Sequence, residues 1–204
     1  RAQGDATLAG AIYDVYDAKT NQIIDARMTG TNQFVIKADG SSNIIRGLPF
    51  DRDYYAIEVK APEGYLLSKE KIMLSLSKTV KVGNRRSIDA QAKENPVSGK
   101  LGIYKHYNKK PGSEIDDKPE EGAVFAVVLK KYVDQYGSVS EAIQHKDQFA
   151  AMEYDIMTTG KDGRAASKDL AYGTYLATQI HAVDQEAEIC RDVYEFRISG
   201  TQNN

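Results

Sequence analysis

Short segments of alternating apolar and polar residues, separated by turn residues, restrict the fold of this chain more than any other feature. In the segment 11–16, Tyr13 and Val15 fall on one side and Asp14 on the other, as in a half-buried strand. Turn signals such as Asp39-Gly40 separate several similar segments. Further strands are predicted at residues 22–24, 34–36, 54–59, 72–76, 79–82, 87–92 and 101–105. Many short strands divided by turns predict an all-β sandwich.

A break in this pattern predicts a domain boundary near residue 97. Pro96 cannot donate to a strand ladder, and Gly99 relaxes the chain before the next strand begins. The boundary divides the chain into domains 1–96 and 97–204, joined by a linker of only a few residues. Each half is long enough to bury a core of its own.

The second half repeats blocks of the first in the same order. Gly10-Ala11-Ile12-Tyr13-Asp14-Val15 returns as Gly122-Ala123-Val124-Phe125-Ala126-Val127. The block from Leu48 to Glu58 returns, at similar spacing, as the block from Leu170 to Gln179. Two ordered blocks favour a duplicated domain, so we predict two tandem immunoglobulin-like β-sandwiches.

One segment of the second half has the pattern of a helix. Ser138 and Glu141 have the spacing of a capping box, and apolar residues after them recur on one helical face. We therefore predict a helix over residues 139–152, inserted near 138–153 between strands of the second sandwich. The acidic stretch 114–121 is interpreted as a solvated loop.

Charge and motif content exclude several classes of function. Lys and Arg number 27 against 29 Asp and Glu, so no concentrated basic face for nucleic acid is expected. The apolar runs are too short for membrane insertion. Cys190 is the single cysteine, and the three histidines lack metal-ligand spacing, so we expect no disulfide framework and no metal site. No familiar catalytic or phosphate-binding motif occurs, so neither an enzyme nor a cofactor is expected.

Three stretches form a recognisable set of blocks: residues 4–13, residues 55–65 with Glu58 before Ala-Pro-Glu-Gly-Tyr, and residues 162–175. With these blocks the sequence resembles the B-type repeat domains of Gram-positive surface proteins and pilins, known as CnaB-type or SpaA-type domains with a prealbumin-like fold. The resemblance implies prealbumin-like sandwiches that act as stalk or spacer modules of a cell-wall-anchored, extracellular surface or pilus protein. Their partners would be neighbouring domains of the same protein. Neither end of the chain shows a leader or an apolar tail, as expected of a cytosolic protein or an excised fragment.

The resemblance also implies a covalent bond between a first-strand Lys and a last-strand Asn, assisted by a Glu. A buried Lys tends to lose its proton and become nucleophilic, and a buried carboxylic acid can polarise the amide and move protons. In the first domain Glu58 and Asn95 match the Glu and Asn positions, and no Lys precedes Gly10. The alternative is that Glu58 faces solvent and that Asn95 forms a turn with Pro96. We expect no Lys–Asn bond in this domain.

In the second domain Lys105 matches the position of the nucleophile, and Gln179 holds the position of the Glu. Asn203 or Asn204 would be the Asn. An amide cannot move protons as a carboxylic acid does, so we expect no bond here either. The alternative is an exposed strand lysine at Lys105 and a solvent-facing Gln179.

A second function remains open at this point, namely an adhesive module that contacts a host protein or glycan. Its motive is the insertion near 138–153, which a spacer does not need. Deletion of that segment is then expected to abolish adhesion and leave the fold intact. A third reading is an accessory module of a secreted enzyme.

Overall fold

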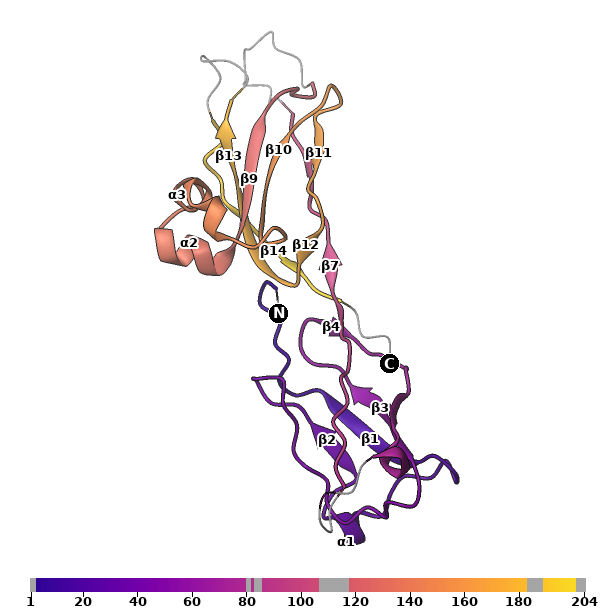
Figure 1. Ribbon diagram of the computed structural model, residues 1–204. Helices are drawn as coiled ribbons and strands as arrows, with labels where there is room; N and C mark the ends of the chain where they lie inside the picture. The colour runs from indigo at the N-terminus through magenta and orange to yellow at the C-terminus, as the bar shows by residue number, and fades with distance from the viewer. Residues whose placement is uncertain (1–2, 80–81, 83–85, 107–117, 183–188, 201–204) are drawn as a thin grey trace. The chain divides into compact units, whose positions relative to one another are not determined.

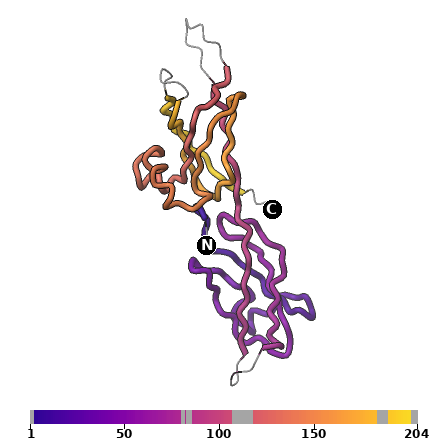
Figure 2. The backbone as a smooth tube through the Cα atoms, turned by 45° about the horizontal axis from the view of Figure 1, so that its top comes forward, coloured from indigo at the N-terminus to yellow at the C-terminus, as the bar shows by residue number. Residues whose placement is uncertain are grey.

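The chain divides into two compact units in this computed structural model, which describes residues 3–79, 82, 86–106, 118–182 and 189–200 (Figure 1). Residues 6–96 make up one unit, which we call the N-terminal unit. Residues 97–200 make up the other, the C-terminal unit, together with the first residues of the chain up to Asp5. Figure 2 shows this indigo start of the chain at the C-terminal unit. Strands dominate both units, which confirms the all-β prediction.

The N-terminal unit is built on a four-stranded antiparallel sheet with the order β2-β1-β3-β5. A two-stranded sheet, β4-β6, accompanies it. A single turn of helix, α1, lies between β1 and β2, and a 3₁₀ turn, η1, follows β5. The elements are β1 (Ile12–Asp17), α1 (Ala26–Thr29), β2 (Gln33–Val35), β3 (Tyr54–Lys60), β4 (Tyr65–Leu66), β5 (Ile72–Leu74), η1 (Leu76–Lys78) and β6 (Asn95–Pro96).

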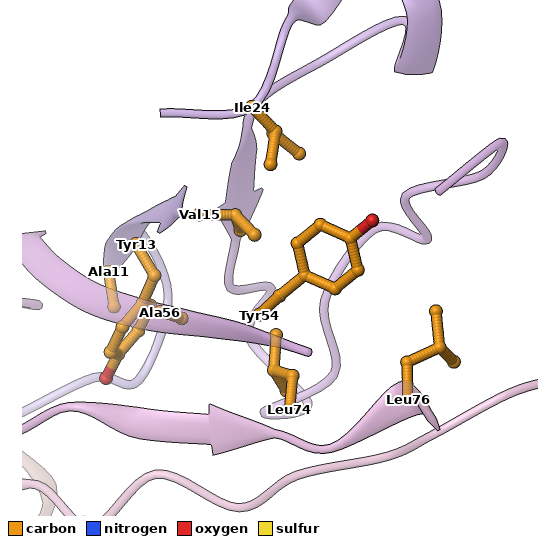
Figure 3. Packing of buried hydrophobic residues seen from close by; sticks show 8 residues of the cluster. All are labelled: Ala11, Tyr13, Val15, Ile24, Tyr54, Ala56, Leu74 and Leu76. Atoms are coloured by element: carbon orange, nitrogen blue, oxygen red, sulfur yellow. The ribbon is translucent and has the colours of Figure 1, made fainter. Parts of the chain in front are cut away.

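The core of the N-terminal unit lies against the buried sides of β1 and β3 (Figure 3). Alternation along β1 buries Tyr13 and Val15 and leaves its other side only partly covered. Tyr54 lies among apolar side chains of neighbouring segments, and its hydroxyl donates to the carbonyl of Pro49 at 2.8 Å. The cluster consists of Ala11, Tyr13, Val15, Ile24, Tyr54, Ala56, Leu74 and Leu76.

The predicted strands at 11–16, 34–36, 54–59 and 72–76 correspond to β1, β2, β3 and β5. Segment 22–24 forms one isolated bridge, between Tyr16 and Ile23, rather than a strand. The strand predicted at 87–92 is wrong: these residues are exposed and form no regular structure. Their alternating apolar residues are one Ile and two Ala, which bury too little area to fix a strand. In the predicted strand 79–82, residues 80 and 81 lie outside the described part of the chain.

The C-terminal unit contains a four-stranded antiparallel sheet with the order β10-β9-β13-β14. Two small antiparallel sheets, β11-β8 and β12-β7, complete its strands. The elements are β7 (Ser98–Gly99), β8 (Gly102–Tyr104), β9 (Val124–Leu129), α2 (Lys130–Tyr136), α3 (Val139–Gln144), η2 (Lys146–Gln148), β10 (Tyr154–Thr158), β11 (Arg164–Ala166), β12 (Leu170–Ala171), β13 (Gly173–His181) and β14 (Tyr194–Ile198).

The inserted helices cover one face of β9. Every residue of β9 after Val124 is buried, whereas β1 alternates between buried and half-buried positions. Ala126 and Val128 of β9 pack in one cluster with apolar side chains of α2 and α3. The residues from the helices are Val133, Val139, Ala142 and Ile143. The insertion therefore builds core around a strand that is apolar on both faces.

The helical prediction is right in position and wrong in extent. Ser138 accepts the backbone N–H of Glu141 at 3.1 Å, which confirms the predicted N-cap. The helix ends at Gln144 and is followed by the 3₁₀ turn η2, whereas the prediction ran to residue 152. Helix α2 was not predicted, because no side chain caps its start at Leu129. Its end did carry a signal, since Gly137 closes it as a C-cap.

Candidate functional site

A buried carboxyl group lies in the N-terminal unit where β1 and β3 pair. Alternation along β3 places Glu58 on the same side as Tyr54 and Ala56, which face the core, and leaves Glu58 only 3% exposed. Across the ladder Glu58 pairs with Tyr13, and the register then shifts so that Ile12 pairs with Lys60. This bulge places a carboxyl group and a phenol side by side in the interior.

The hydrogen bonds around Glu58 leave two carboxylate oxygens without a donor. The backbone N–H of Ser68 donates to Glu58 Oε2 at 2.6 Å. The hydroxyl of Tyr13 donates to Glu94 Oε1 at 2.5 Å, which draws the Glu94 side chain from the last segment of the unit to the same place. The other oxygens, Glu58 Oε1 and Glu94 Oε2, are buried and find no hydrogen-bond partner among the described residues. We call Tyr13, Glu58, Ser68 and Glu94 the acid cluster.

Burial is the main electrostatic influence on the acid cluster. Loss of water, together with the neighbouring carboxylate of Glu94, raises the pKa of Glu58 to about 7, although the Ser68 N–H acts in the opposite direction. Burial and the hydrogen bond to Glu94 also raise the pKa of the Tyr13 hydroxyl far above its ordinary value. Burial likewise raises the pKa of Tyr65, with Glu94 as the second cause.

The two orphaned oxygens make the acid cluster a place to hold one proton. A proton on Glu58 Oε1 turns that oxygen into a donor, and the Glu94 carboxyl group is its electrostatic neighbour. Sharing the proton would satisfy both oxygens and relieve the repulsion between two buried carboxylates. The cluster can therefore store a proton near neutral pH, and it offers the protonated acid that an amide-forming reaction uses.

The C-terminal unit has the same backbone arrangement without the acid. Phe125 of β9 pairs with Gln179 of β13, and the register then shifts so that Val124 pairs with His181. Phe125 has no hydroxyl to donate, and Gln179, 4% exposed, bonds through its amide to backbone groups. Its Nε2 donates to the carbonyl of His181 at 3.1 Å, and its Oε1 accepts from the N–H of Cys190 at 3.3 Å. The same position is thus neutral and fully satisfied in this unit.

Lys105 is held by a carboxylate that the sequence did not single out. Its Nζ lies 3.3 Å from Oε2 of Glu120, and the N–H of Glu120 donates to the carbonyl of Lys105 at 3.0 Å. Glu120 is 3% exposed, so the interpretation of the acidic stretch as a solvated loop is wrong at this residue. The Lys105 side chain is thus engaged in an ion pair with a buried carboxylate.

The remaining predicted site residues lie apart from the acid cluster or outside the described residues. Asn95 is exposed in β6, where it pairs with Leu66, so the adjacent Glu94 and not Asn95 reaches Glu58. Asn203 and Asn204 lie outside the described part of the chain. Tyr13 and Glu94 were missed, and only the alternation that places Tyr13 opposite β3 was a usable signal.

Within the described residues, no three His, Cys, Asp or Glu side chains are arranged to hold a metal ion. The helices in that part of the chain are also too short or too polar to cross a membrane.

Comparisons with known proteins identify the fold of the N-terminal unit. Residues 2–87 match the model of the family described as "SpaA: Prealbumin-like fold domain". Among solved structures, the TIE protein of Bacillus anthracis is similar over 99% of this chain, with 19% identity and a TM-score of 0.53. This chain spans 31% of that one, and at such identity the likeness bears on the fold alone. No curated protein sequence matches the chain.

Two solved pilus proteins are also similar, with lower TM-scores. The minor pilin GBS52 of Streptococcus agalactiae has 16% identity and a TM-score of 0.35, covering 97% of this chain and 80% of its own. A C-terminal fragment of the pilus adhesin SpaC from Lactobacillus rhamnosus GG has 14% identity and a TM-score of 0.45. That match covers 96% of this chain and 76% of the fragment. The family match confirms the resemblance seen in the sequence: residues 2–87 are similar to the SpaA family of prealbumin-like fold domains.

Proposed function

We propose that this chain supplies two tandem prealbumin-like modules to the stalk of a cell-wall-anchored surface or pilus protein. The observation that carries the proposal is the match of residues 2–87 to the SpaA prealbumin-like family. The proposed domains are those predicted from the sequence, 1–96 and 97–204, except that the start of the chain up to Asp5 groups with the second. Their partners are neighbouring domains of the same protein. Neither domain turns over a substrate.

The repeated register supports extending the proposal to the second half. The block repeated in the sequence forms the second strand of each four-stranded sheet, β1 in one unit and β9 in the other. The pairing of β1 with β3 and that of β9 with β13 both shift by one residue at the same place. Tyr13 and Glu58 meet at this shift in one unit, and Phe125 and Gln179 in the other. A bulge kept at one position in two sheets is the mark of a shared design. A spacer made of repeated modules needs this kind of duplication.

The location of the protein tests the proposal. Antibodies raised against this chain are expected to detect it, in the bacterium that makes it, in material released by a cell-wall-digesting enzyme. Detergent extraction of intact cells should leave it behind, because the attachment is expected to be covalent. Detection in the cytosolic fraction alone, or a full-length gene without signal peptide and sorting signal, would contradict the proposal.

The adhesive alternative loses its motive. The insertion near 138–153 supplies Val139, Ala142 and Ile143 to the core on β9, which gives it a structural role that needs no binding partner. We now expect deletion of residues 138–153 to destabilise the fold, because it would uncover β9 and remove these buried side chains. Loss of adhesion after such a deletion would report unfolding rather than a binding site.

We expect no Lys–Asn bond within this chain, and intact mass spectrometry measures this directly. Lys105 is paired with Glu120, and the amide of Gln179 is engaged by backbone groups. Each bond would expel one ammonia, so the purified chain should have its full sequence mass. A deficit of one ammonia that disappears in Lys105→Ala would contradict this prediction.

A further inference from the structure

The first residues of the chain are bound to the C-terminal unit by a set of specific contacts. Glu153 Oε1 accepts the backbone N–H of Gly4 at 2.9 Å. The N–H of Asp5 donates to the carbonyl of Tyr172 at 2.9 Å, and Asp5 Oδ2 accepts the N–H of Thr174 at 3.1 Å. Backbone and side chain of this short segment are thus both recognised. We call this arrangement the Gly-Asp clasp.

The carboxylate that receives Gly4 is buried and held in place by other donors. Glu153 is 4% exposed, and its Oε2 accepts from the hydroxyl of Tyr132 at 2.5 Å and from the N–H of Ala150 at 3.2 Å. Lys131 Nζ lies 2.9 Å from Oε1 of Glu153 and 3.4 Å from the carbonyl oxygen of Gly4. The acceptor for Gly4 is therefore fixed by the unit itself, as in a built binding site.

The fit leaves no room for a side chain at two positions. Gly4 has a φ of +67°, and a Cβ there would lie 2.1 Å from the carbonyl oxygen of Tyr172. Gly173, on the receiving side, has a φ of +153°, and a Cβ there would lie 2.8 Å from Oδ2 of Asp5 and 2.7 Å from Cδ1 of Leu129. The clash at Gly4 is with a backbone oxygen and cannot be relieved by rotating a side chain, and the positive φ at both positions favours glycine. The site therefore selects glycine followed by aspartate.

We propose that the C-terminal unit carries a peptide-recognition site for a Gly-Asp segment, which Gly4 and Asp5 of the same chain occupy. Glu153, Lys131, the Tyr172 carbonyl and the Thr174 N–H form the site. The site recognises a segment that belongs to neither the strands nor the core of the unit. A free peptide of the same sequence is therefore a ligand once the chain's own segment is released, because the tethered segment otherwise competes at high effective concentration.

The first test is amide exchange at Thr174, followed by NMR in the full chain. In Asp5→Ala, which leaves Gly4 and the backbone unchanged, exchange at Thr174 should be about tenfold faster, because its acceptor is removed. In Gly10→Ala, a matched control with positive φ and open space at the Cβ position, exchange should stay as in the wild type. Unchanged exchange in Asp5→Ala would overturn the proposal.

The second test uses the peptide Ala-Gln-Gly-Asp-Ala-Thr, with the sequence of residues 2–7, carrying a fluorescent label. It should bind the full-length Gly4→Ala variant at least about tenfold more tightly than the wild-type chain. The same peptide with Ala in place of its Gly should bind neither. Absence of saturable binding to the variant would contradict the proposal. If protection of the Thr174 amide from exchange rises with the concentration of the wild-type protein, a second copy supplies the segment. That result would contradict occupancy by the same chain.

Discussion

Raising the pH from 4.5 to above 7 is expected to lower the free energy of unfolding of the N-terminal unit by about 3 kcal/mol. The pKa of Glu58 is 4.5 when exposed and about 7 in the fold, so the folded unit binds the extra proton between these values. A group whose folded pKa is raised contributes its stabilisation in the protonated form. The contribution is fully present below pH 4.5 and is lost as the pH rises toward 7 and beyond.

The other shifted carboxylates of this unit act in a different pH range. Hydrogen bonds outweigh burial and lower the pKa of Asp17, and hydrogen bonds from Ser77 lower that of Asp53. Their contributions are lost only as the pH falls below their ordinary value of 3.8. The decline in the free energy of unfolding between pH 4.5 and pH 7 therefore reports on Glu58. Denaturant unfolding at a series of pH values, with hydrogen-exchange mass spectrometry of peptides from residues 6–79, measures it for this unit alone.

The variant Glu58→Gln should remove this pH dependence. Its amide oxygen can still accept from Ser68, and its NH₂ group can donate to the orphaned Glu94 Oε2. The C-terminal unit already carries Gln179 at the equivalent place. Glu70→Gln, which removes one exposed carboxylate, is the control. Its free energy of unfolding should fall with pH as steeply as that of the wild type. The explanation fails if Glu58→Gln shows the same fall.

Replacing Glu153 by Gln is expected to lower the free energy of unfolding of the C-terminal unit by roughly 3 kcal/mol. The carboxylate accepts from Tyr132, Lys131, Gly4 and Ala150. An amide has one oxygen for these donors, so its NH₂ group would face the N–H of Ala150, which cannot accept, and the Tyr132 hydroxyl would have to accept instead of donate. Lys131 also loses its partner in the ion pair.

The effect of Glu153 on acid stability has the opposite sign to that of Glu58. Burial alone would raise the pKa of Glu153, but hydrogen bonds from Tyr132 and Lys131 outweigh it and lower the pKa below 4.5. Its stabilisation is present above pH 4.5 and is lost as the pH falls further. Hydrogen exchange in peptides from residues 118–182 during denaturant unfolding measures the loss in Glu153→Gln. Glu121→Gln, at an exposed position, should unfold like the wild type, and equal unfolding of both variants would exclude this role.

The sequence predicted the elements whose pattern is local. Strand β1 alternates clearly, so its position and the burial of Tyr13 followed from period two, whereas β3 is buried at three successive residues. Glu58 became a candidate through the family resemblance, and the register of β1 and β3 then placed it beside Tyr13. The cap at Ser138 was also predictable, since a capping box needs only residues three apart.

The other site residues depend on contacts that no local pattern encodes. Glu94 follows a segment without regular structure, so alternation could not show which way its side chain points. Glu120 belongs to an acidic stretch of the kind that usually faces solvent, and its burial depends on Lys105 and the backbone across from it. Glu153 receives Gly4 from 149 positions away along the chain. Such long-range polar contacts become visible only in the folded chain.

The two units share one sheet plan and differ where the ladder shifts: Tyr13 and Glu58 meet in one unit, and Phe125 and Gln179 in the other, so that only Glu58 can hold a proton. Carbon-13 NMR of the Glu58 side-chain carboxyl in the full chain, assigned by its absence in Glu58→Gln, tests this most directly. The account predicts a titration midpoint of about 7. A midpoint near the ordinary value of 4.5 would contradict it.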